Sequence, residues 1–362
     1  MDTQIKALFL TKYAREGASS RYRFLQYFPF LEENGIACTY SPLTDSKYLE
    51  HLYASGAGTV LDITRSFVRR LKALCSVGRY DVVVVEYEIF PYFPALAEYL
   101  LKRTGIPYIV NYDDAIFYRY SQHPNLIVRG LLGNKIDSVM RYADLVIAGN
   151  DHLAAYAKKT GAARVETLPT VVDVRRYPEK RPASQGVFTI GWIGSPTTAK
   201  YLKEIAPALA RVCAGGRGQV VLIGSGPVEL TDVPVVAKPW SEATEIADLE
   251  LCDAGIMPLH DGLWERGKCA LKLIQYMACG LPVVVSPVGM NTQLVDDGAN
   301  GYLATDETGW TEALTKLRDD KALRERMGSL GRRKAEKEYS LLAAAPKMAA
   351  FIKQAAAKGK KR

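Results

Sequence analysis

The fold is indicated most clearly by the segment MPLHDGLWERGKCALKLIQYMACGLPVVVSPVGMN, residues 257–291. It starts at the end of one apolar run, Ala254–Met257, and contains a second one, Pro282–Val285. Between them the spacing predicts a helix from about Lys268 to Met277 or Cys279, since Gly280 and Pro282 stop it. A strand, a helix and a strand in succession are typical of a parallel sheet.

The same alternation of short β-branched runs and helical patterns extends along the whole chain, which predicts the α/β class. The strands predicted in the first half are Ile5–Leu10, Asp81–Glu86, Tyr108–Asn111, Leu145–Ala148 and Val165–Leu168. Those predicted in the second half are Phe188–Trp192, Val220–Ile223, Ala254–Met257 and Pro282–Val285. The helices predicted in the first half are Arg21–Asn34, Asp62–Val77 and Tyr92–Thr104. We therefore expect two doubly wound, Rossmann-like domains that face each other across a ligand-binding cleft.

The boundary between the two domains is predicted from a charged stretch without periodicity that contains two prolines, and the linker is expected near 176–186. The first domain is expected over residues 1–178 and the second over residues 186–340. Residues 341–362 are predicted to form a C-terminal helix that packs back toward the first domain and ends in a basic tail.

Composition excludes several classes of protein. With 362 residues, 48% of them hydrophobic and 24% charged, the chain is neither disordered nor fibrous. The net charge is +8, but six basic residues lie after residue 346, where no acid follows, so that residues 1–346 carry only +2. The tail is either a solvated terminus or a contact with an anionic membrane surface. No helix-turn-helix, RNP or zinc-finger pattern is present, and we expect no nucleic-acid partner.

Spacing also argues against a metal site and a membrane span. The six cysteines never form CxxC, and the four histidines do not fall at zinc-ligand spacing, so no metal is expected. The longest apolar runs are far shorter than the roughly 18 residues that a membrane helix needs. The apolar stretch at the amino end, Ala7–Leu10, is too short for a signal peptide. The expected location is therefore cytoplasmic, with peripheral contact at the inner membrane face as the sharper alternative.

Three loops of small residues follow predicted strands, and each suits the close approach of a phosphate to the backbone. The first contains Ser19 and Ser20 before a helix that begins at Arg21; its plain alternative is a turn in which Ser20 caps the helix. The other two contain the residues Gly194, Ser195, Lys200 and Gly224. No glycine triplet has the GxGxxG spacing, so the loops favour a nucleotide diphosphate over a dinucleotide.

Within the predicted helix of the opening stretch, Lys268, Lys272 and Gln275 follow one another at helical spacing. We interpret them as a polar stripe that meets the diphosphate, with Leu271 and Ile274 on the face toward the sheet. The alternative is an ordinary solvated surface.

Acidic residues follow two strands of the first half. Asp113 and Asp114 come just after Tyr108–Asn111, where they can orient an acceptor hydroxyl or accept its proton. The alternative is a helix cap. Glu86 and Glu88 stand at another strand end, and either a structural or an acceptor-side role suits them.

Several segments together resemble the retaining glycosyltransferases of family four, which have the GT-B fold. The resemblance covers nearly the whole chain and rests on the segments AGNDHLAAYAKKTG, TLPTVVDVRRYP, IGWIGSPTTAKYL, LIGSGP and ERGKCALKLIQYMACGLPVVVSP. It implies the transfer of a sugar from a nucleotide diphosphate sugar to an acceptor hydroxyl without a catalytic metal or further cofactor. It also implies that the first domain binds the acceptor and the second the nucleotide.

The chain departs from the family pattern at both glutamates and at one residue of a cation pair. Where the family usually carries two glutamates separated by seven residues, the aligned residues are Gly267 and Gln275. Glu265 is a candidate substitute for the first, and Gln275 can bind ribose through its amide. The arginine of the family's cation pair falls at Ser195-Pro196, which leaves Lys200 or, as the favoured replacement, Lys268 at the diphosphate.

The sequence thus predicts a UDP- or GDP-sugar-dependent transferase that acts on a glycan, a lipid-linked glycan or a cell-surface polysaccharide precursor. A sugar-nucleotide epimerase of the same fold and a non-catalytic, two-lobed sugar-binding protein are the alternatives. A membrane contact is expected through the basic tail and the residues Arg21, Arg23, Arg69, Arg70 and Lys72.

Overall fold

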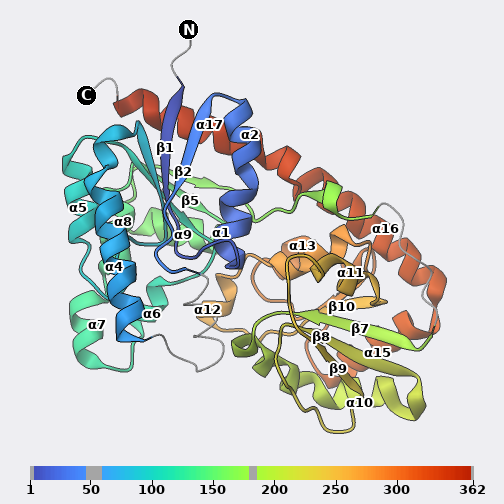
Figure 1. The fold of residues 1–362 in the computed structure, drawn as a ribbon. Coiled ribbons are helices and arrows are strands. Elements are labelled where there is room, and N and C mark those ends of the chain that lie inside the picture. The colour runs from blue at the N-terminus through green and yellow to red at the C-terminus, as the bar shows by residue number, and fades with distance from the viewer. Residues whose placement is uncertain (1–3, 46–58, 179–185, 360–362) are drawn as a thin grey trace. The chain divides into compact units, whose positions relative to one another are not determined.

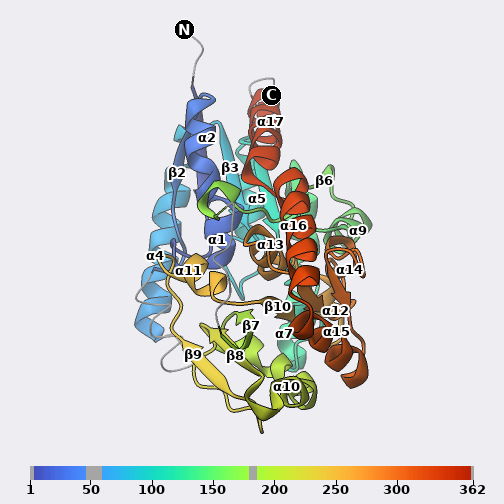
Figure 2. The same ribbon diagram turned by 90° about the vertical axis from the view of Figure 1, so that its right-hand side faces the viewer.

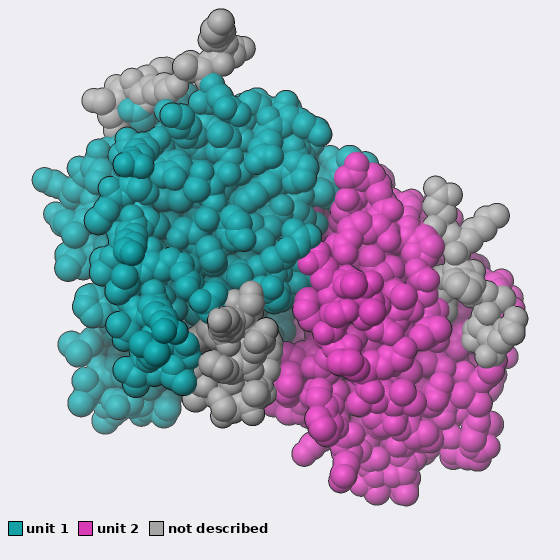
Figure 3. Space-filling model, in the orientation of Figure 1, with its two compact units in different colours: residues 1–170, 267–269, 341–362 teal, residues 171–266, 270–340 magenta. Residues whose placement is uncertain are grey.

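A computed structural model describes residues 4–45, 59–178 and 186–359 of the chain. These residues form two compact units, shown in two colours in Figure 3. Unit 1 comprises residues 1–170, 267–269 and 341–362, and unit 2 comprises residues 171–266 and 270–340. Among the described residues, no helix combines the length and the apolar character that crossing a bilayer requires.

Unit 1 is built on a parallel six-stranded sheet with the order β2-β1-β3-β4-β5-β6 (Figure 1). Its strands are β1 (Ile5–Leu10), β2 (Ile36–Tyr40), β3 (Val82–Glu86), β4 (Tyr108–Tyr112), β5 (Leu145–Ala148) and β6 (Val165–Thr167). The central strands β3 and β4 are buried on both faces, which explains why their sequences are continuous apolar runs rather than alternating ones.

Helices cover both faces of this sheet. They are α1 (Ala18–Arg23), α2 (Phe28–Glu33), α4 (Val60–Cys75), α5 (Leu96–Arg103), α6 (Phe117–Ser121), α7 (Leu126–Leu132), α8 (Lys135–Tyr142), α9 (Asp151–Lys159) and α17 (Leu341–Gly359). Helix α17 contacts α2, β1, β3 and β4, as Figures 1 and 2 show. Because parallel crossovers are right-handed, the connections that move along the sheet from β2 to β6 place α4, α5, α6–α8 and α9 on the face opposite α17.

Unit 2 repeats the architecture with the strand order β12-β11-β10-β7-β8-β9, again all parallel. Its strands are β7 (Phe188–Ile193), β8 (Gly218–Ile223), β9 (Val235–Lys238), β10 (Ala254–Met257), β11 (Val283–Val285) and β12 (Gly301–Leu303). Its helices are the 3₁₀ helix η4 (Pro196–Ile205), α10 (Ala206–Cys213), α11 (Glu245–Glu250), α12 (Leu263–Arg266), α13 (Leu271–Ala278), α14 (Asn291–Leu294), α15 (Glu307–Asp319) and α16 (Lys321–Glu338).

The two parallel, doubly wound sheets confirm the predicted fold class. The helix predicted over Arg21–Asn34 is in fact broken into α1, a 3₁₀ turn over Leu25–Tyr27, and α2. The sequence reading also missed β2, β9 and β12. All three are edge strands and carry mixed rather than purely apolar residues, so their hydrophobic signal is weak.

The chain passes from unit 1 to unit 2 at Thr170, whereas the sequence placed the end of the first domain near 178. Residues 171–178 are hydrogen-bonded within unit 2. The amide of Val172 donates to the carbonyl of Tyr339 at 3.0 Å, and the Arg332 guanidinium donates to the carbonyls of Val174 and Pro178. Part of the predicted linker, residues 179–185, lies outside the described residues, as do tail residues 360–362.

Candidate functional site

Each sheet has a point at which the strand order reverses, and in open α/β sheets ligands bind beyond the carboxyl ends of the strands there. In unit 1 the reversal lies between β1 and β3, because β2 and β3 flank β1 on opposite sides. In unit 2 it lies between β7 and β10. Fold topology therefore directs attention to the residues that follow these strands.

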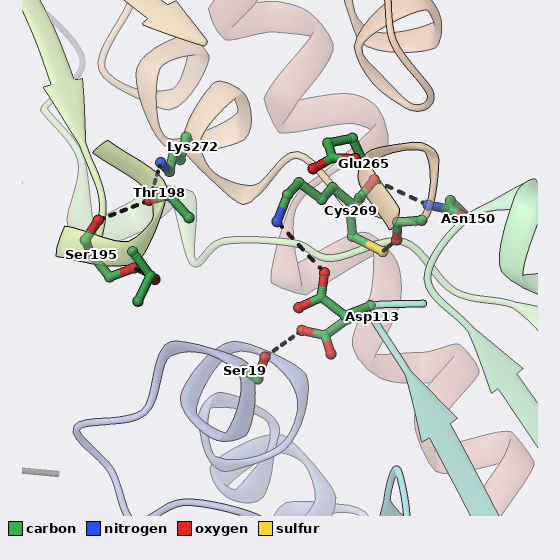
Figure 4. A network of polar contacts seen from close by, with 12 residues as sticks. Ser19, Asp113, Asn150, Ser195, Thr198, Glu265, Cys269 and Lys272 are labelled. Atoms are coloured by element: carbon green, nitrogen blue, oxygen red, sulfur yellow. Dashed lines mark hydrogen bonds and ion pairs between the residues drawn. The ribbon is translucent and has the colours of Figure 1, made fainter. Parts of the chain in front are cut away.

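In unit 1, the centre of the polar cluster is Asp113, which follows β4 (Figure 4). The hydroxyl of Ser19, on α1, donates to Asp113 Oδ2 at 2.6 Å, and the Tyr87 hydroxyl donates to Asp113 Oδ1. Burial raises the pKa of Tyr87 well above its usual value, which keeps this hydroxyl protonated and a donor. Tyr87 also has a left-handed backbone (φ 63°), a strain that concentrates at functional sites.

Asp114 faces a cation. The ammonium of Lys268 lies 3.9 Å from Asp114 Oδ1. Burial raises the pKa of Asp114 to about 6, a shift that the Lys268 charge opposes and the Asp113 charge adds to. Neither aspartate caps α6, because the residue at the cap of that helix is Ile116. The structure thus excludes the capping interpretation of the pair.

Lys268 reaches Asp114 because residues 267–269 are packed into unit 1. A Cβ added to Gly267 would lie 2.5 Å from the Cβ of Ala115, so that only glycine fits there. The amide of Asn150 donates to the carbonyl of Lys268 at 3.0 Å, and Cys269 is buried beside Gly149. A glutamate at position 267, as in the family pattern, would clash with this packing.

The other loop residues predicted in unit 1 are held by internal contacts. The Ser20 hydroxyl donates to Glu86 Oε2 at 2.6 Å, and the amide of Lys12 donates to the same oxygen at 2.6 Å. Burial, reinforced by the Asp113 charge, raises the pKa of Glu86 to about 7. Ser20 is not a helix cap, since α1 begins at Ala18. Arg21 is buried and donates to the carbonyls of Arg15 and Glu16.

In unit 2, the loop after β7 meets a cation of α13 (Figure 4). The Lys272 ammonium donates to Thr198 Oγ1 at 3.4 Å and lies 4.0 Å from the centre of the Trp192 ring. A Cβ added to Gly194 would lie 2.3 Å from this ammonium. Lys272 therefore rests directly on the backbone of the glycine loop.

A second glycine shapes the same loop. Gly224, which follows β8, has φ +79°, and a Cβ there would lie 2.9 Å from the carbonyl oxygen of Gly194. Both loops thus require glycine for close approach. Ser195 Oγ is 2.9 Å from the hydroxyl of Thr197, and Lys200 is exposed, with its ammonium 5.0 Å from the Tyr201 ring centre.

Glu265, on α12, is buried and belongs to a cluster that the sequence did not predict. Its carboxylate accepts a hydrogen bond from the Tyr201 hydroxyl, and His260 Nε2 lies 3.2 Å from Glu265 Oε1. Glu204 is 3.7 Å from the other nitrogen of this histidine. His260 follows β10, at the reversal of the unit 2 sheet, and that position in a strand-end loop was the available signal.

The polar stripe predicted for α13 does not exist. The helix begins at Leu271, after Ala270 in a left-handed conformation (φ 52°), so that Lys268 lies outside it. Gln275 is buried, along with most of α13, because the helix packs on β10, β11 and α16. Leu271 is only half-buried, and Leu273 and Tyr276 take the core positions instead.

Comparison with known proteins identifies the second unit. A family model described as Glycosyl transferases group 1 matches residues 187–320. These residues form a glycosyl transferases group 1 domain. The Gly194 loop, Glu265 and Lys272 belong to the matched range, whereas the aspartates of unit 1 precede it.

A curated relative and two solved structures extend the match. N-acetyl-alpha-D-glucosaminyl L-malate synthase of Bacillus anthracis is 26% identical over 150 residues, which span 39% of this chain and 38% of the relative. Sucrose-phosphate synthase from Thermosynechococcus elongatus superposes with a TM-score of 0.69 at 15% identity, over 97% of this chain and 98% of that one. Anabaena HepE in complex with UDP-glucose superposes with a TM-score of 0.68 at 16% identity, over 97% and 100%.

The group 1 match confirms the predicted family resemblance over residues 187–320, and the solved structures confirm the GT-B fold. Within the described residues, no group of three histidine, cysteine, aspartate or glutamate side chains is arranged to hold a metal ion.

The predicted membrane-facing set is wrong for three of its residues. Arg21, Arg23 and Arg70 are each at most 3% exposed and therefore do not contact a leaflet. Arg23 donates instead to Asn111 Oδ1 at 3.0 Å and to the carbonyl of Leu168 at 2.9 Å. The amphipathic pattern predicts that these arginines are exposed to solvent. Their guanidinium groups instead donate hydrogen bonds to backbone carbonyls and a side-chain amide in the interior.

Proposed function

We propose that this chain is a glycosyltransferase that moves a sugar from a nucleotide diphosphate sugar, with UDP or GDP as the nucleotide, to an acceptor hydroxyl, and that retains the anomeric configuration. The observation that carries the proposal is the Lys272 ammonium, which rests on the Gly194 backbone at the reversal of the unit 2 sheet. A fixed cation over a glycine loop is suited to a diphosphate.

The chemistry follows from where charge develops. When the glycosidic bond to the donor phosphate breaks, negative charge grows on the diphosphate. Lys272 is held in place by Thr198 and the Trp192 ring, so that it meets this charge without first reorganising. In this assignment Lys272, rather than Lys268, is the principal cation, because Lys268 already faces Asp114.

The donor class is supported by a relative and a neighbour. The Bacillus anthracis relative is named N-acetyl-alpha-D-glucosaminyl L-malate synthase, and Anabaena HepE was solved with UDP-glucose. The alignment spans only 38% of the Bacillus relative, and the HepE likeness is at 16% identity, so both support the donor class without specifying the sugar. Glu265, Gln275, Ser195 and Gly224 are proposed to line the donor.

The acceptor is proposed to bind at the unit 1 cluster. Asp113 is positioned by hydrogen bonds from Ser19 and Tyr87. The pKa of Asp114 is about 6, so its carboxylate is mostly ionised at neutral pH and can take up the proton of the acceptor hydroxyl. The acceptor hydroxyl belongs to a glycan or a lipid-linked glycan in this proposal. Transfer is proposed to need no metal, with the charge of the leaving diphosphate balanced by lysine.

Thermal denaturation with candidate ligands tests the donor site. UDP or GDP is expected to raise the melting temperature, because a ligand that binds only the folded state stabilises it. NAD and free sugars are expected to have no effect. Stabilisation by NAD alone would contradict the proposal, and stabilisation by free sugar alone would favour the sugar-binding protein.

Turnover is then tested by a donor screen that measures release of nucleoside diphosphate with and without acceptor glycans, before and after EDTA. We expect release that depends on the acceptor and survives chelation. Loss on chelation that magnesium or manganese restores would show that a metal, rather than Lys272, balances the diphosphate charge.

An epimerase remains the second candidate because His260 and Glu265 lie 3.2 Å apart, as an acid and base beside a sugar would. It predicts inversion of a sugar carbon in the nucleotide sugar with no acceptor present. Proton NMR of a UDP-sugar incubated with the protein alone distinguishes the two: exchange of a sugar C–H with deuterium would favour the epimerase.

A further inference from the structure

Two helices on one face of unit 1 bury charged side chains and expose apolar ones. Helix α4 buries Ser66 and Arg70 and exposes Val60, Leu61, Val68 and Leu71. Helix α5 buries Glu98 together with Leu101 and exposes Leu96, Tyr99 and Leu100. A surface helix normally turns its apolar stripe to the core and its charges to water.

The buried charges explain how these helices are attached. The Arg70 guanidinium donates to the carbonyls of Thr11 and Ser41 at strand ends, and Glu98 accepts from the amide of Ile89 at 2.7 Å. Polar anchors therefore hold both helices on the sheet. Their apolar residues are left to face outward, which costs free energy unless something covers them.

The exposed apolar surface continues beyond α4 and α5. The loop before α5 exposes Tyr92 and Phe93, each about half, and α7 exposes Leu126, Ile127 and Leu131 by 68% to 77%. All three helices lie in the connections that cover one face of the unit 1 sheet, on the left of Figure 1. Most of the large apolar side chains exposed in the described part of the chain belong to these segments.

The charge around this surface is mainly positive, although Arg69 forms an ion pair with Asp45 at 2.7 Å. Cations exposed or half-buried on these helices are Arg65, Arg69, Lys72, Lys102, Arg103 and Arg129. The acids of the same three helices are Asp62, which takes part in the capping box at Thr59, and the buried Glu98. Apolar side chains interleaved with an excess of cations are the pattern of a helix that lies in the headgroup region of a bilayer.

We propose that the outward faces of α4, α5 and α7, with the loop at Tyr92 and Phe93, form a docking surface for an anionic lipid bilayer. A second copy of the chain suits this surface less well, because a symmetric contact would bring its cations against their own copies. The docking surface does not depend on the proposed transferase reaction. It differs from the contact predicted from sequence, which used buried arginines and the basic tail.

Flotation with vesicles tests the proposal on the full chain. The protein is expected to bind vesicles of phosphatidylcholine with phosphatidylglycerol, and to bind phosphatidylcholine alone much more weakly. The double variant Val68→Ser, Leu71→Ser is expected to lose about tenfold in affinity for the mixed vesicles, because both side chains would insert. The matched control is Leu251→Ser, Leu342→Ser, whose leucines are 59% and 56% exposed elsewhere and whose loss should leave binding unchanged.

A charge variant separates the two contributions. Arg65→Gln with Lys72→Gln is expected to weaken binding to the mixed vesicles by about fivefold per cation, roughly 1 kcal/mol each, and to reduce the dependence on salt. Equal binding to neutral vesicles, or equal losses in the leucine control, would overturn the proposal. So would a dimer in sedimentation that Leu71→Ser abolishes, since the occupant would then be a second copy.

The chain also contains a site for a fluorescent label that reports contact with the bilayer, and this measurement needs no substitution in the docking surface. Cys75, the exposed cysteine among the six, is at the end of α4. Burial raises the pKa of the half-buried Cys38 to about 12, so its thiolate is scarce at neutral pH and labelling favours Cys75. A polarity-sensitive fluorophore there should shift to shorter wavelength on adding mixed vesicles. An unchanged spectrum while the protein floats would show that another surface binds.

Discussion

The two sheets of this protein are both parallel and doubly wound, with different strand orders, and they carry opposite chemistry at their carboxyl edges. In unit 1 the strand ends present acids, with Asp113 and Asp114 after β4 and Glu86 at the end of β3. In unit 2 the strand ends present glycines, and the nearest cation is Lys272 on a neighbouring helix. Glu86 is buried and the two aspartates are half-buried, and the pKa values of Glu86 and Asp114 are raised, whereas the glycines allow other groups to approach the backbone closely.

The comparison indicates that the strand order determines where a ligand can bind, whereas the side chains at the strand ends determine which ligand binds there. A desolvated acid is suited to hydroxyl groups and protons, and an anion would be repelled there. A glycine loop with a fixed ammonium is suited to phosphate. Two sheets of similar architecture can therefore bind two different substrates.

The largest effect is expected at the cation of unit 2. Lys272→Ala should lower kcat about a hundredfold or more, by analogy with the removal of one donor at a developing negative charge. Exposed Lys200 on the same unit is the matched control, and Lys200→Ala should stay near normal. Steady-state kinetics with a fixed acceptor measures both. The opposite result would move the diphosphate to the η4 segment and remove the assigned difference between the units.

A smaller loss is expected at the acids. Asp113→Asn should lower kcat roughly tenfold to thirtyfold, the worth of one hydrogen bond to a charged group, and leave UDP affinity unchanged. Calorimetric titration with UDP and kinetics with varied acceptor separate the two quantities. Weakened UDP binding in this variant would show that the acid edge also contacts the nucleotide.

A shift in pH dependence is expected from Lys268. Its charge favours the ionised form of Asp114, so Lys268→Met should raise the pKa of that carboxyl above about 6. The acidic limb of the kcat/KM profile should move up by about one pH unit. Lys200→Met is the control and should not move it. A profile that keeps its position while kcat falls would assign Lys268 to the diphosphate after all.

The smallest effect on turnover is expected from Glu86→Gln, which instead alters stability. Because burial raises the folded pKa of Glu86 to about 7, the folded state keeps a proton that the unfolded state releases near its ordinary pKa of 4.5. The free energy of unfolding should therefore fall as pH rises from about 4.5 to 7, by up to about 3 kcal/mol. Urea denaturation across this range should show a flatter dependence in the variant. An equal slope in both proteins would place the ionisation elsewhere.

Much of the fold and part of the site were predictable from local patterns. Apolar runs such as Val82–Val85 predicted buried parallel strands, and Asp113 was recognised because it directly follows one. Tyr201 was not predicted to meet Glu265, because their contact joins segments 64 residues apart. Nothing in the local sequence of either segment marks the other as its partner.

The α/β alternation and the strand-end positions of the acids and glycines follow from the sequence alone, since the periodicity of apolar residues and the order of segments are local properties of the chain. Only the tertiary structure decided which face of a helix is covered. Arg70 looked solvated, but carbonyls of Thr11 and Ser41 bind it in the interior and turn the leucines of α4 outward. Likewise, the left-handed turn at Ala270 and the packing of Gly267 on Ala115 assign Lys268 to unit 1. Both outcomes depend on partners distant in the chain, and a local pattern carries no information about them.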